Sequence, residues 1–479
     1  MKNSSIIKSL KIPSFFTSLS LPALFAFPAL FAFLAFLAFL AFSPSISAQV
    51  RQPFSSAQKA AQCEKIKAAC RHAWDGYKTY ASGYDALKPI SRTGRNWYGT
   101  SFMMTPLDAF DTFYLLGMKK EAGEAKSMVV NGLNFNVDTE VQLFEVNIRL
   151  MGGLLSAYEL TKDKRLLTLA KDLGTRLLPA FNSPTGMPYR FVNLVTGKTR
   201  DALSNPAETG TYLLEFGKLT QLTKDSTFYR VAKKAAFEVF KRRTDLDLVG
   251  TTIDVNTGEW KNTECQIGAR IDSYFEYLYK AWLLFGDRDC KDAWEIHNRA
   301  IMKYMFTEVP SGGYFTRVDM RSGKETNSLY GALDAFYAGI LALSGDIPHA
   351  RKIQQGNYAM WTKFGIEPEE FNFRTGQVTD PSYPLRPENI ESCFYLYRKT
   401  KDNQYLRMGE QMVIDILTKC KTEAGFAEMK DVTKLETSDS MESFFLAETL
   451  KYAYLLFAPE KTLDLGKVVF NTEAHLLKK

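Results

Sequence analysis

Residues 154–173, which read LLSAYELTKDKRLLTLAKDL, show the repeating unit from which the fold of this chain can be predicted. Apolar residues recur at three-and-four spacing on both sides of a polar turn around Asp163, a pattern that predicts two amphipathic helices. The turn is so short that the two helices must be antiparallel neighbours. The stretch therefore predicts one helical hairpin.

The same plan recurs four more times along the chain. The copies read LLEFGKLTQLTKDSTFYRVAKKA (213–235), YFEYLYKAWLLFGDRDCKDAWEI (274–296), FYAGILALSGDIPHARKI (336–353) and CFYLYRKTKDNQYLRMGEQM (393–412). Their turn aspartates follow one another at spacings of 62, 62, 59 and 56 residues. Looser copies precede and follow them at 108–128 and 441–462. The chain thus contains about seven predicted hairpins, a repeat architecture of helix pairs.

The segments between hairpins predict where the loops lie. Residues 181–201 and 251–266 contain Pro, Gly, Asn and Val, which suits β-hairpins or long loops on one face. Seven hairpins with such loops indicate an all-α fold, a closed (α/α)7 barrel or toroid. An open solenoid is the alternative. Closure is favoured because the terminal copies are as apolar as the middle ones and lack polar capping faces.

The first 48 residues differ from the rest of the chain. Three lysines precede an apolar run from Leu21 to Phe42, and small residues ending at Ala48 follow it. This is the layout of a secretory signal peptide, which predicts export to the medium or the periplasm. The run is also long enough to span a bilayer, so an uncleaved membrane anchor is the alternative. Residues 49–479 contain no interior linker and are expected to form a single catalytic barrel domain.

Composition excludes some functions. The formal net charge of +7 falls to +4 once the three lysines of the first 48 residues are removed, too little for a nucleic-acid footprint on a chain of this size. The six cysteines form no CxxC motif and no zinc-binding spacing. Cys63 and Cys70 are two helical turns apart and should not pair within a helix, and the sequence leaves any other pairing open.

Charged residues interrupt the apolar pattern near the starts of the predicted inner helices. They are Glu145 and Arg149; Glu208 and Glu215; Arg270, Asp272 and Glu276; Arg386, Glu388 and Glu391; and Glu442 and Glu448. Each group alone has an ordinary structural explanation, such as an i,i+4 salt bridge or a solvated helix start. Together they predict an acid-rich central pocket, because buried carboxylates need partners, water or a cation. Two carboxylates across an aromatic-lined pocket are typical of glycoside hydrolysis.

At these residues the sequence resembles the class I α-mannosidases, glycoside hydrolase family 47. The resemblance runs from about Ala73 to His475. It rests on AWDGYKTYASGYDALKPIS (73–91), TPLDAFDTFYLLG (105–117), FEVNIRLMGGLLSAY (144–158), IGARIDSYFEYLYKAW (267–282), LRPENIESCFYLYRKTKD (385–402), MESFFLAETLKYAYLLF (441–457) and FNTEAH (470–475), which follow in family order. The resemblance implies an (αα)7 barrel and removal of terminal α-1,2-linked mannose from high-mannose N-glycans, with inversion at the anomeric carbon.

The resemblance also implies residue roles. Glu145 would be the general acid, acting through a water, and Glu388 the general base; the role of Asp272, the third catalytic carboxylate, and an exchange of acid and base stay open. Thr472 would bind Ca²⁺ through its hydroxyl and carbonyl oxygens, with waters held by Glu391, Glu448 and Glu473. The positions implied to contact the terminal mannose are Arg149, Glu208, Arg270, Arg386, Phe444, Glu448 and Glu473.

The sequence departs from the family pattern at Ser328, where the processing enzymes have a histidine; in this, and in the run IDSYFEY, it is closer to the glycoprotein-degradation branch. A mannose-binding lectin on the same fold is therefore the alternative function. Retention of all three carboxylates and of the calcium threonine favours catalysis. The expected partner is a high-mannose glycan or an α-1,2-mannose oligosaccharide, bound by a monomer that contacts a membrane only if residues 1–48 are retained.

Overall fold

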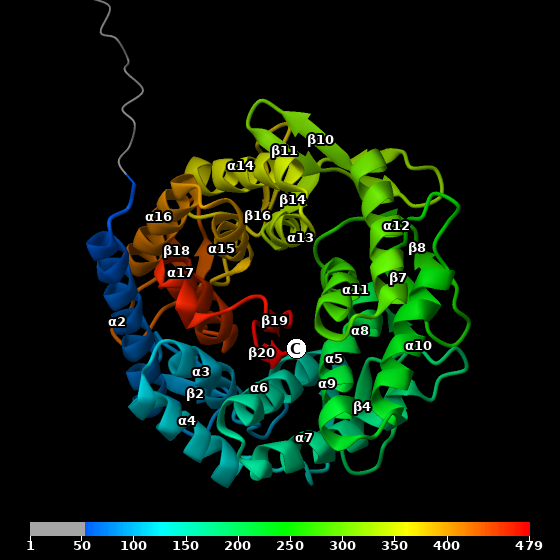
Figure 1. The fold of residues 1–479 in the computed structure, drawn as a ribbon, viewed down its shortest axis with the longest axis horizontal. Coiled ribbons are helices and arrows are strands. Elements are labelled where there is room, and N and C mark those ends of the chain that lie inside the picture. Colours follow the sequence, from blue (N-terminus) through cyan, green and yellow to red (C-terminus); the bar gives the residue numbers. More distant parts are fainter. Residues whose placement is uncertain (1–52) are drawn as a thin grey trace, which may run out of the picture. The chain divides into compact units, whose positions relative to one another are not determined.

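A computed structural model describes residues 53–479 of the chain, so the expected signal segment at 1–48 lies outside the described residues. Residues 54–479 form one compact unit. Within it, helices are arranged as two concentric rings around a central axis (Figure 1). The inner ring consists of α3 (Met104–Leu115), α5–η1–α6 (Leu143–Val146, Asn147–Met151, Gly152–Thr161), α8 and α9 (Pro206–Gly210, Leu213–Thr223), α11 (Asp272–Phe285), η3–α13 (Leu333–Ala335, Phe336–Ser344), α15 (Glu388–Thr400) and η4–α17 (Phe445–Thr449, Leu450–Phe457).

The outer ring also has seven members in this part of the chain. They are α2 (Ser56–Tyr80), α4 (Lys119–Gly132), α7 (Lys164–Leu177, followed by η2, Leu178–Phe181), α10 (Thr227–Lys241), α12 (Arg288–Tyr304), α14 (Ile347–Phe364) and α16 (Asn403–Lys419). Consecutive inner helices contact one another in order, and η4 contacts α3, so the ring is closed. The fold is an (α/α)7 barrel, which confirms the predicted fold class.

The repeated turns have one physical design. In the five repeats that have a turn aspartate, the residue after the inner helix adopts the left-handed conformation, as Lys162, Gly286 and Lys401 do, and the aspartate follows it at the start of the outer helix. The Asp163 carboxylate accepts a hydrogen bond from Arg165 N at 3.2 Å, a side-chain N-cap that Asp287, Asp346 and Asp402 share. These short turns make the inner helix of each such repeat antiparallel to its outer partner.

The seventh helix pair differs from the prediction. The looser copy at 441–462 contributes an inner helix, α17, but no outer partner; the short η5 (Glu460–Thr462) follows instead. Pro459 explains the stop, because the residue before a proline is pushed out of the helical region, and Ala458 is indeed extended at ψ 152°. The outer partner of α17 is α2, from the other end of the described chain. The first and last long helices of the described chain, α2 and α17, thus pack together and close the ring.

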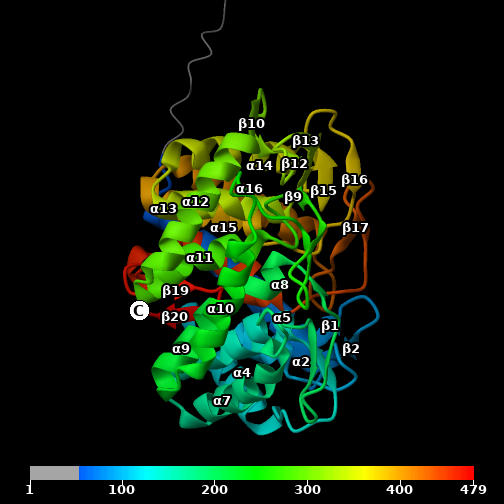
Figure 2. The ribbon, with the colours of Figure 1, turned by 90° about the vertical axis from the view of Figure 1, so that its right-hand side faces the viewer.

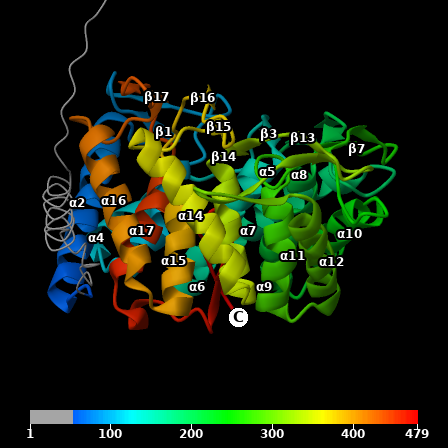
Figure 3. The same cartoon turned by 90° about the horizontal axis from the view of Figure 1, so that it is seen from above.

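Short antiparallel strands cover one face of the ring, as Figures 2 and 3 show. Four three-stranded sheets each join a strand that lies before an inner helix to the hairpin that follows an outer helix: β3-β4-β5 (Glu140–Gln142, Phe191–Asn193, Thr199–Arg200), β6-β7-β8 (Leu203–Ser204, Thr252–Asp254, Trp260–Asn262), β9-β12-β13 (Glu264–Cys265, Arg317–Asp319, Glu325–Asn327) and β14-β15-β16 (Leu329–Gly331, Glu370–Asn372, Val378–Asp380). Two-stranded hairpins are β1-β2 (Ala86–Lys88, Thr93–Arg95), β10-β11 (Phe306–Val309, Gly312–Phe315) and β17-β18 (Met429–Asp431, Glu436–Thr437). The expected hairpins at 181–201 and 251–266 are confirmed.

The last hairpin, β19-β20 (Val468–Phe470, Leu476–Lys478), enters the ring from the face opposite the sheets and lies at its centre (Figures 1 and 2). Its tip closes the barrel from that side. All six cysteines lie in the described part of the chain, each buried and without a disulfide partner; Cys63 and Cys70 share α2, as expected. No helix in residues 53–479 is long and apolar enough to cross a bilayer.

Candidate active site

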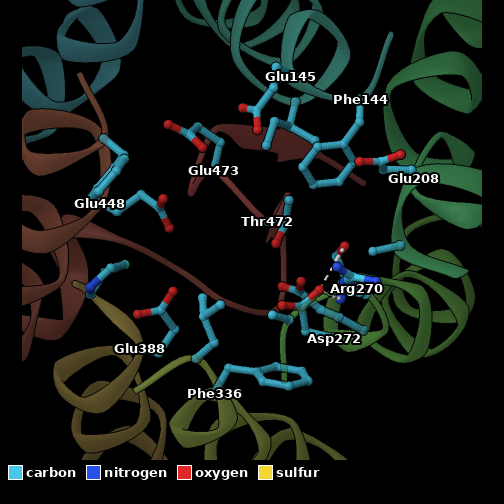
Figure 4. Close-up of a pocket in the computed structure, with 18 of the residues that line it drawn as sticks. Phe144, Glu145, Glu208, Arg270, Asp272, Phe336, Glu388, Glu448, Thr472 and Glu473 are labelled. Atoms are coloured by element: carbon cyan, nitrogen blue, oxygen red, sulfur yellow. Dashed lines mark hydrogen bonds between the residues drawn. The ribbon is translucent and has the colours of Figure 1, made fainter. Parts of the chain in front are cut away.

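The centre of the barrel contains a cavity of about 270 Å³, close to the lower end of the range for small-molecule sites. It opens toward the strand-covered face and is closed below by the tip of β19-β20. Carboxylates, arginines and phenylalanines project into it from separate inner helices, as Figure 4 shows. The predicted residues that line it are Glu145, Arg149, Glu208, Arg270, Asp272, Glu276, Arg386, Glu388, Glu391, Phe444, Glu448, Thr472 and Glu473, whereas Glu442 is not part of the lining.

The fold explains why acids meet here. Every inner helix runs in the same direction, so all seven N-termini lie at one end of the barrel, where the positive helix ends favour carboxylates. Asp272 and Glu388 are the first residues of α11 and α15, and Glu145 lies in the first turn of α5. Figure 4 shows Glu145 on one side of the cavity and Glu388 on the other, with Thr472 between them.

Two members of the inner ring, α5–η1–α6 and η4–α17, contain a π-helical segment beside the cavity. Arg149 lies in η1 (Asn147–Met151) and Glu448 in η4 (Phe445–Thr449). Such single-turn π segments inside α-helices are frequent at functional sites, because they reorient side chains at a cost in backbone geometry.

Burial makes several of these acids hard to ionise. It raises the pKa of Asp272 to about 7 and, against the opposing effect of Arg386, that of Glu388 to about 8. Glu388 Oε2 is buried and has no hydrogen-bond partner among the described residues. Burial, together with repulsion from Glu473, raises the pKa of Glu448 well above its usual value. The cavity therefore holds more carboxylates than its own cations neutralise.

Carboxylates fix two of the cavity arginines in place. Arg149 is almost fully buried; its Nε donates to Glu145 Oε2 at 3.0 Å, and its Nη1 is ion-paired with Glu473. Arg386 donates to both carboxylate oxygens of Glu369, at 2.6 and 3.0 Å. Both guanidinium groups lie within 6 Å of the Phe444 ring, at 5.6 and 5.8 Å from its centroid.

The rim of the cavity toward the strands has a different character. Glu208, at the start of α8, accepts hydrogen bonds from Arg190 Nη2 at 2.9 Å and Gln142 Nε2 at 3.0 Å. Arg270 is exposed, has a positive φ of 76° and faces Thr252 at 3.4 Å. Glu208 and Arg270 therefore line the part of the cavity nearest the strands.

The tip of β19-β20 is held from several sides. Asn471 Nδ2 donates to Ile148 O at 2.9 Å and to Glu215 at 2.8 Å, while its Oδ1 accepts from the backbone of Glu473 and His475. The backbone N–H of Thr472 faces the Tyr277 hydroxyl at 3.4 Å. The Thr472 side chain is thereby aimed into the cavity.

His475 anchors the same tip to α3. Its ring nitrogens lie 3.1 Å from Asp108 and 3.2 Å from Asp111, and all three residues are fully buried. Burial alone would lower the pKa of His475, but the two aspartates outweigh it and raise the pKa to about 9. Lys451 completes the network by donating to Ala474 O at 2.5 Å and pairing with Asp111 at 2.7 Å.

The donor set at the tip fits a calcium ion. Thr472 offers a hydroxyl and a carbonyl oxygen, and the surrounding acids have a surplus of negative charge, which suits a hard cation with oxygen ligands. Within the described residues no three His, Cys, Asp or Glu side chains are close enough together to bind a metal directly. An ion beside Thr472 would therefore take most of its ligands from water, and Glu391, Glu448 and Glu473 are placed to hold those waters.

Sequence reasoning missed some of the site. Phe144, Phe336 and Gln142 also line the cavity, but aromatic and amide residues are common at the starts of helices and gave no signal. Glu215, which interrupts the apolar pattern of α9, does not line the cavity. It accepts hydrogen bonds from Tyr277, Asn147 and Asn471. Ser328 also lies outside the cavity lining.

An acid-rich cavity at the centre of a closed helical barrel, with carboxylates facing one another across aromatic rings, defines a glycosidase-type protein. Residues 69–479 match the family model for glycosyl hydrolase family 47, and the chain belongs to this family of glycoside hydrolases. It is 38% identical over 435 residues to Alpha-mannosidase I MNS4 of Arabidopsis thaliana, covering 86% of this chain and 69% of the relative.

Three further comparisons support the assignment. The human mannosyl-oligosaccharide 1,2-alpha-mannosidase IB is 37% identical over 448 residues, covering 86% of this chain and 69% of that protein. The solved structure of the alpha-1,2-mannosidase from Trichoderma reesei superimposes with a TM-score of 0.81 at 27% identity, covering 88% of this chain and 99% of that one. Human ER degradation-enhancing alpha-mannosidase-like protein 2 is 38% identical over 453 residues, covering 86% of this chain and 76% of that protein.

Proposed function

We propose that this protein is an exported, calcium-dependent α-mannosidase that hydrolyses terminal α-1,2-linked mannose from high-mannose N-glycans or related oligosaccharides, with inversion. One observation supports this function most strongly. Glu145, Asp272 and Glu388, from inner helices far apart in sequence, line the same cavity as Thr472. The relatives named as 1,2-α-mannosidases support the choice of linkage.

Glu145 is the proposed general acid, which protonates the leaving glycosidic oxygen through one water. Its side chain keeps 20% of its surface exposed, so water can reach it, while the bond from Arg149 holds the carboxyl in place. General acid catalysis of this kind contributes typically 10² to 10⁴ in rate.

Glu388 is the proposed general base, which removes a proton from the water that attacks the anomeric carbon. Its position across the cavity from Glu145 leaves room for that water, as an inverting mechanism requires. A base must be ionised at the working pH, yet burial raises the pKa of Glu388 to about 8. Arg386 opposes this rise, and a cation bound near Thr472 would oppose it further. Asp272 is the third carboxylate at the reacting sugar.

Calcium, when bound by Thr472 and its surrounding waters, would contact vicinal hydroxyls of the terminal mannose and orient the ring. Phe444 provides an apolar face for that ring. Arg149 and Arg386, each within 6 Å of the Phe444 ring centroid, are placed to donate hydrogen bonds to the remaining hydroxyls.

The direct test is release of mannose from α-1,2-mannobiose in the presence of calcium and again after chelation. The proposal predicts release that stops on chelation and resumes when calcium is restored. Binding of the disaccharide without release would instead favour the lectin alternative.

Glu388→Gln tests the assignment of the base, since glutamine preserves the shape of the side chain but cannot accept a proton. Turnover should fall by at least about 10³ while binding of mannobiose survives. The control is Glu308→Gln, an exposed acid paired with Lys352 on the outer surface, which should leave turnover unchanged. Unchanged turnover in the Glu388 variant would contradict the assignment.

Export is a separate element of the proposal and rests on residues 1–48. Cleavage after Ala48 predicts that protein recovered from the medium or the periplasm begins at Gln49, which N-terminal sequencing would detect. Full-length protein found only in the membrane fraction would favour the anchor alternative.

A further inference from the structure

Five side chains beside the cavity alternate between cation and aromatic ring. Arg95 lies 5.9 Å from the centroid of the Trp97 ring, and Arg149 lies 5.0 Å from the same ring. Arg149 also lies 5.6 Å from the Phe444 ring, and Arg386 lies 5.8 Å from it. We call this series, Arg95, Trp97, Arg149, Phe444 and Arg386, the cation–aromatic column.

The column joins four parts of the fold. Arg95 ends β2 and Trp97 follows it, Arg149 lies in η1, Phe444 precedes η4 and Arg386 precedes α15. Arg149, Phe444 and Arg386 line the cavity; Arg95 and Trp97 are not part of its lining. Trp97 is therefore not placed to touch a sugar in this cavity and acts through Arg149.

Three carboxylates compete for the Arg149 guanidinium. Its guanidinium pairs with Glu145 at 3.0 Å, lies 3.7 Å from Asp108, and is ion-paired with Glu473. Glu145 is the most exposed of these acids, with 20% of its side chain accessible against 0% for Asp108 and 3% for Glu473. Charge pairs strengthen as water is excluded, so the two deeper acids attract the guanidinium more strongly than Glu145 does.

The face of Trp97 opposes that attraction. A guanidinium group above an aromatic face gains about 0.5 to 2 kcal/mol. The Trp97 and Phe444 ring centroids lie 5.0 and 5.6 Å from the guanidinium carbon of Arg149, whose Nε–H donates to Glu145. With the Trp97 ring gone, the guanidinium can move further toward Asp108 and Glu473, with which it already pairs, and its bond to Glu145 weakens.

We infer that Trp97 is a positioning residue for proton donation: its ring holds Arg149 in the orientation that keeps Glu145 aimed at the leaving oxygen. The inference rests on the proposed function, since it concerns the residue proposed there as the acid. It adds to that function a residue that lies outside the sugar pocket.

The test compares two substrates that differ in their need for an acid. The leaving group of α-1,2-mannobiose must be protonated, whereas fluoride departs from α-mannosyl fluoride without a proton. Trp97→Leu should lower kcat/KM for mannobiose by about tenfold, mainly through kcat. The fluoride also uses the sugar contacts of Arg149, so its kcat/KM should fall as well, but several-fold less than that of mannobiose.

Two controls separate this effect from damage to the fold. Trp97→Phe retains an aromatic face and should keep most of the mannobiose activity; it sacrifices no hydrogen bond, because Trp97 Nε1 has no partner among the described residues. Trp282→Leu removes a partly buried tryptophan near the C-terminal end of α11, which Lys291 covers at 5.2 Å and which is not part of the cavity lining, and it should affect neither substrate.

Equal losses on both substrates in Trp97→Leu, or no loss on either, would overturn the inference. Glu145→Gln, measured in parallel, reports on the proposed function itself. It should slow mannobiose far more than the fluoride; equal slowing there would show that Glu145 is not the acid, whatever the Trp97 variants do.

Discussion

Asn471→Ala should destabilise the protein by more than any ordinary surface change, because this one side chain ties the tip of β19-β20 to the barrel. Its amide makes four buried hydrogen bonds, of 2.9 Å to Ile148 O, 2.8 Å to Glu215, 3.0 Å from Glu473 N and 2.7 Å from His475 N. At about 1 kcal/mol each, their loss costs about 4 kcal/mol.

Dividing this loss of unfolding free energy by an unfolding entropy of about 2 cal/mol/K per residue gives a melting temperature lower by roughly 4 to 5 °C for a folded unit of this size. Differential scanning calorimetry at a fixed scan rate, in calcium-free buffer, measures it. Asn131→Ala is the matched control, since Asn131 is exposed in α4 and makes one surface bond, of 3.2 Å to Ser127. A melting temperature for Asn471→Ala within about 1 °C of the wild type would refute the reasoning.

Three further predictions follow from the same geometry. Gly76→Ala would place a Cβ 1.6 Å from the carbonyl oxygen of Ala424 and should prevent α2 from closing the ring, whereas Gly123→Ala meets nothing within 4 Å and should be neutral or stabilising, as thermal melting would show. Because the folded protein keeps a proton on Glu388 up to about pH 8 that the unfolded chain loses near pH 4.5, this group's contribution to stability declines as the pH rises between those values. Calcium-free Glu388→Gln should therefore melt above the wild type at about pH 8.5 and at the same temperature at about pH 4; a higher melting temperature at the lower pH alone would contradict the burial argument. Thr472→Val removes one proposed calcium ligand and should raise the calcium Kd by at least about tenfold in calorimetric titration, and an unchanged Kd would place the ion elsewhere.

The helical framework was predictable because its signals are local. Each turn aspartate, such as Asp163 or Asp402, caps the outer helix that follows it, so the sequence contains both the helices and the sharp reversal between them. The origin of the seventh pair was not predictable in this way. Packing of α2 on α17 joins residues about 400 positions apart, as does the contact of the Phe457 ring with that of Phe54, just before α2, and no local pattern encodes it.

The carboxylates of the candidate site were also predictable from the sequence, but the residues that orient them were not. Carboxylates such as Glu388 and Asp272 stand out because they interrupt helices that are otherwise apolar, and their convergence follows from the common direction of the inner helices. The residues that orient them gave no such signal. Glu369 lies in a polar loop where acids are ordinary, although it fixes Arg386, and Trp97 resembles any core aromatic until its place against Arg149 is seen.

Glu145 and Glu388 are proposed to act from opposite sides of a sugar held above Thr472, and the anomer released first tests this arrangement most directly. Proton NMR of α-1,2-mannobiose during the first minutes of hydrolysis separates the two anomers before mutarotation mixes them. We predict that β-mannose forms first, since water activated by Glu388 attacks the face opposite the leaving group. Initial release of α-mannose would mean that a carboxylate attacks the sugar itself, and the proposed arrangement of acid and base would be wrong.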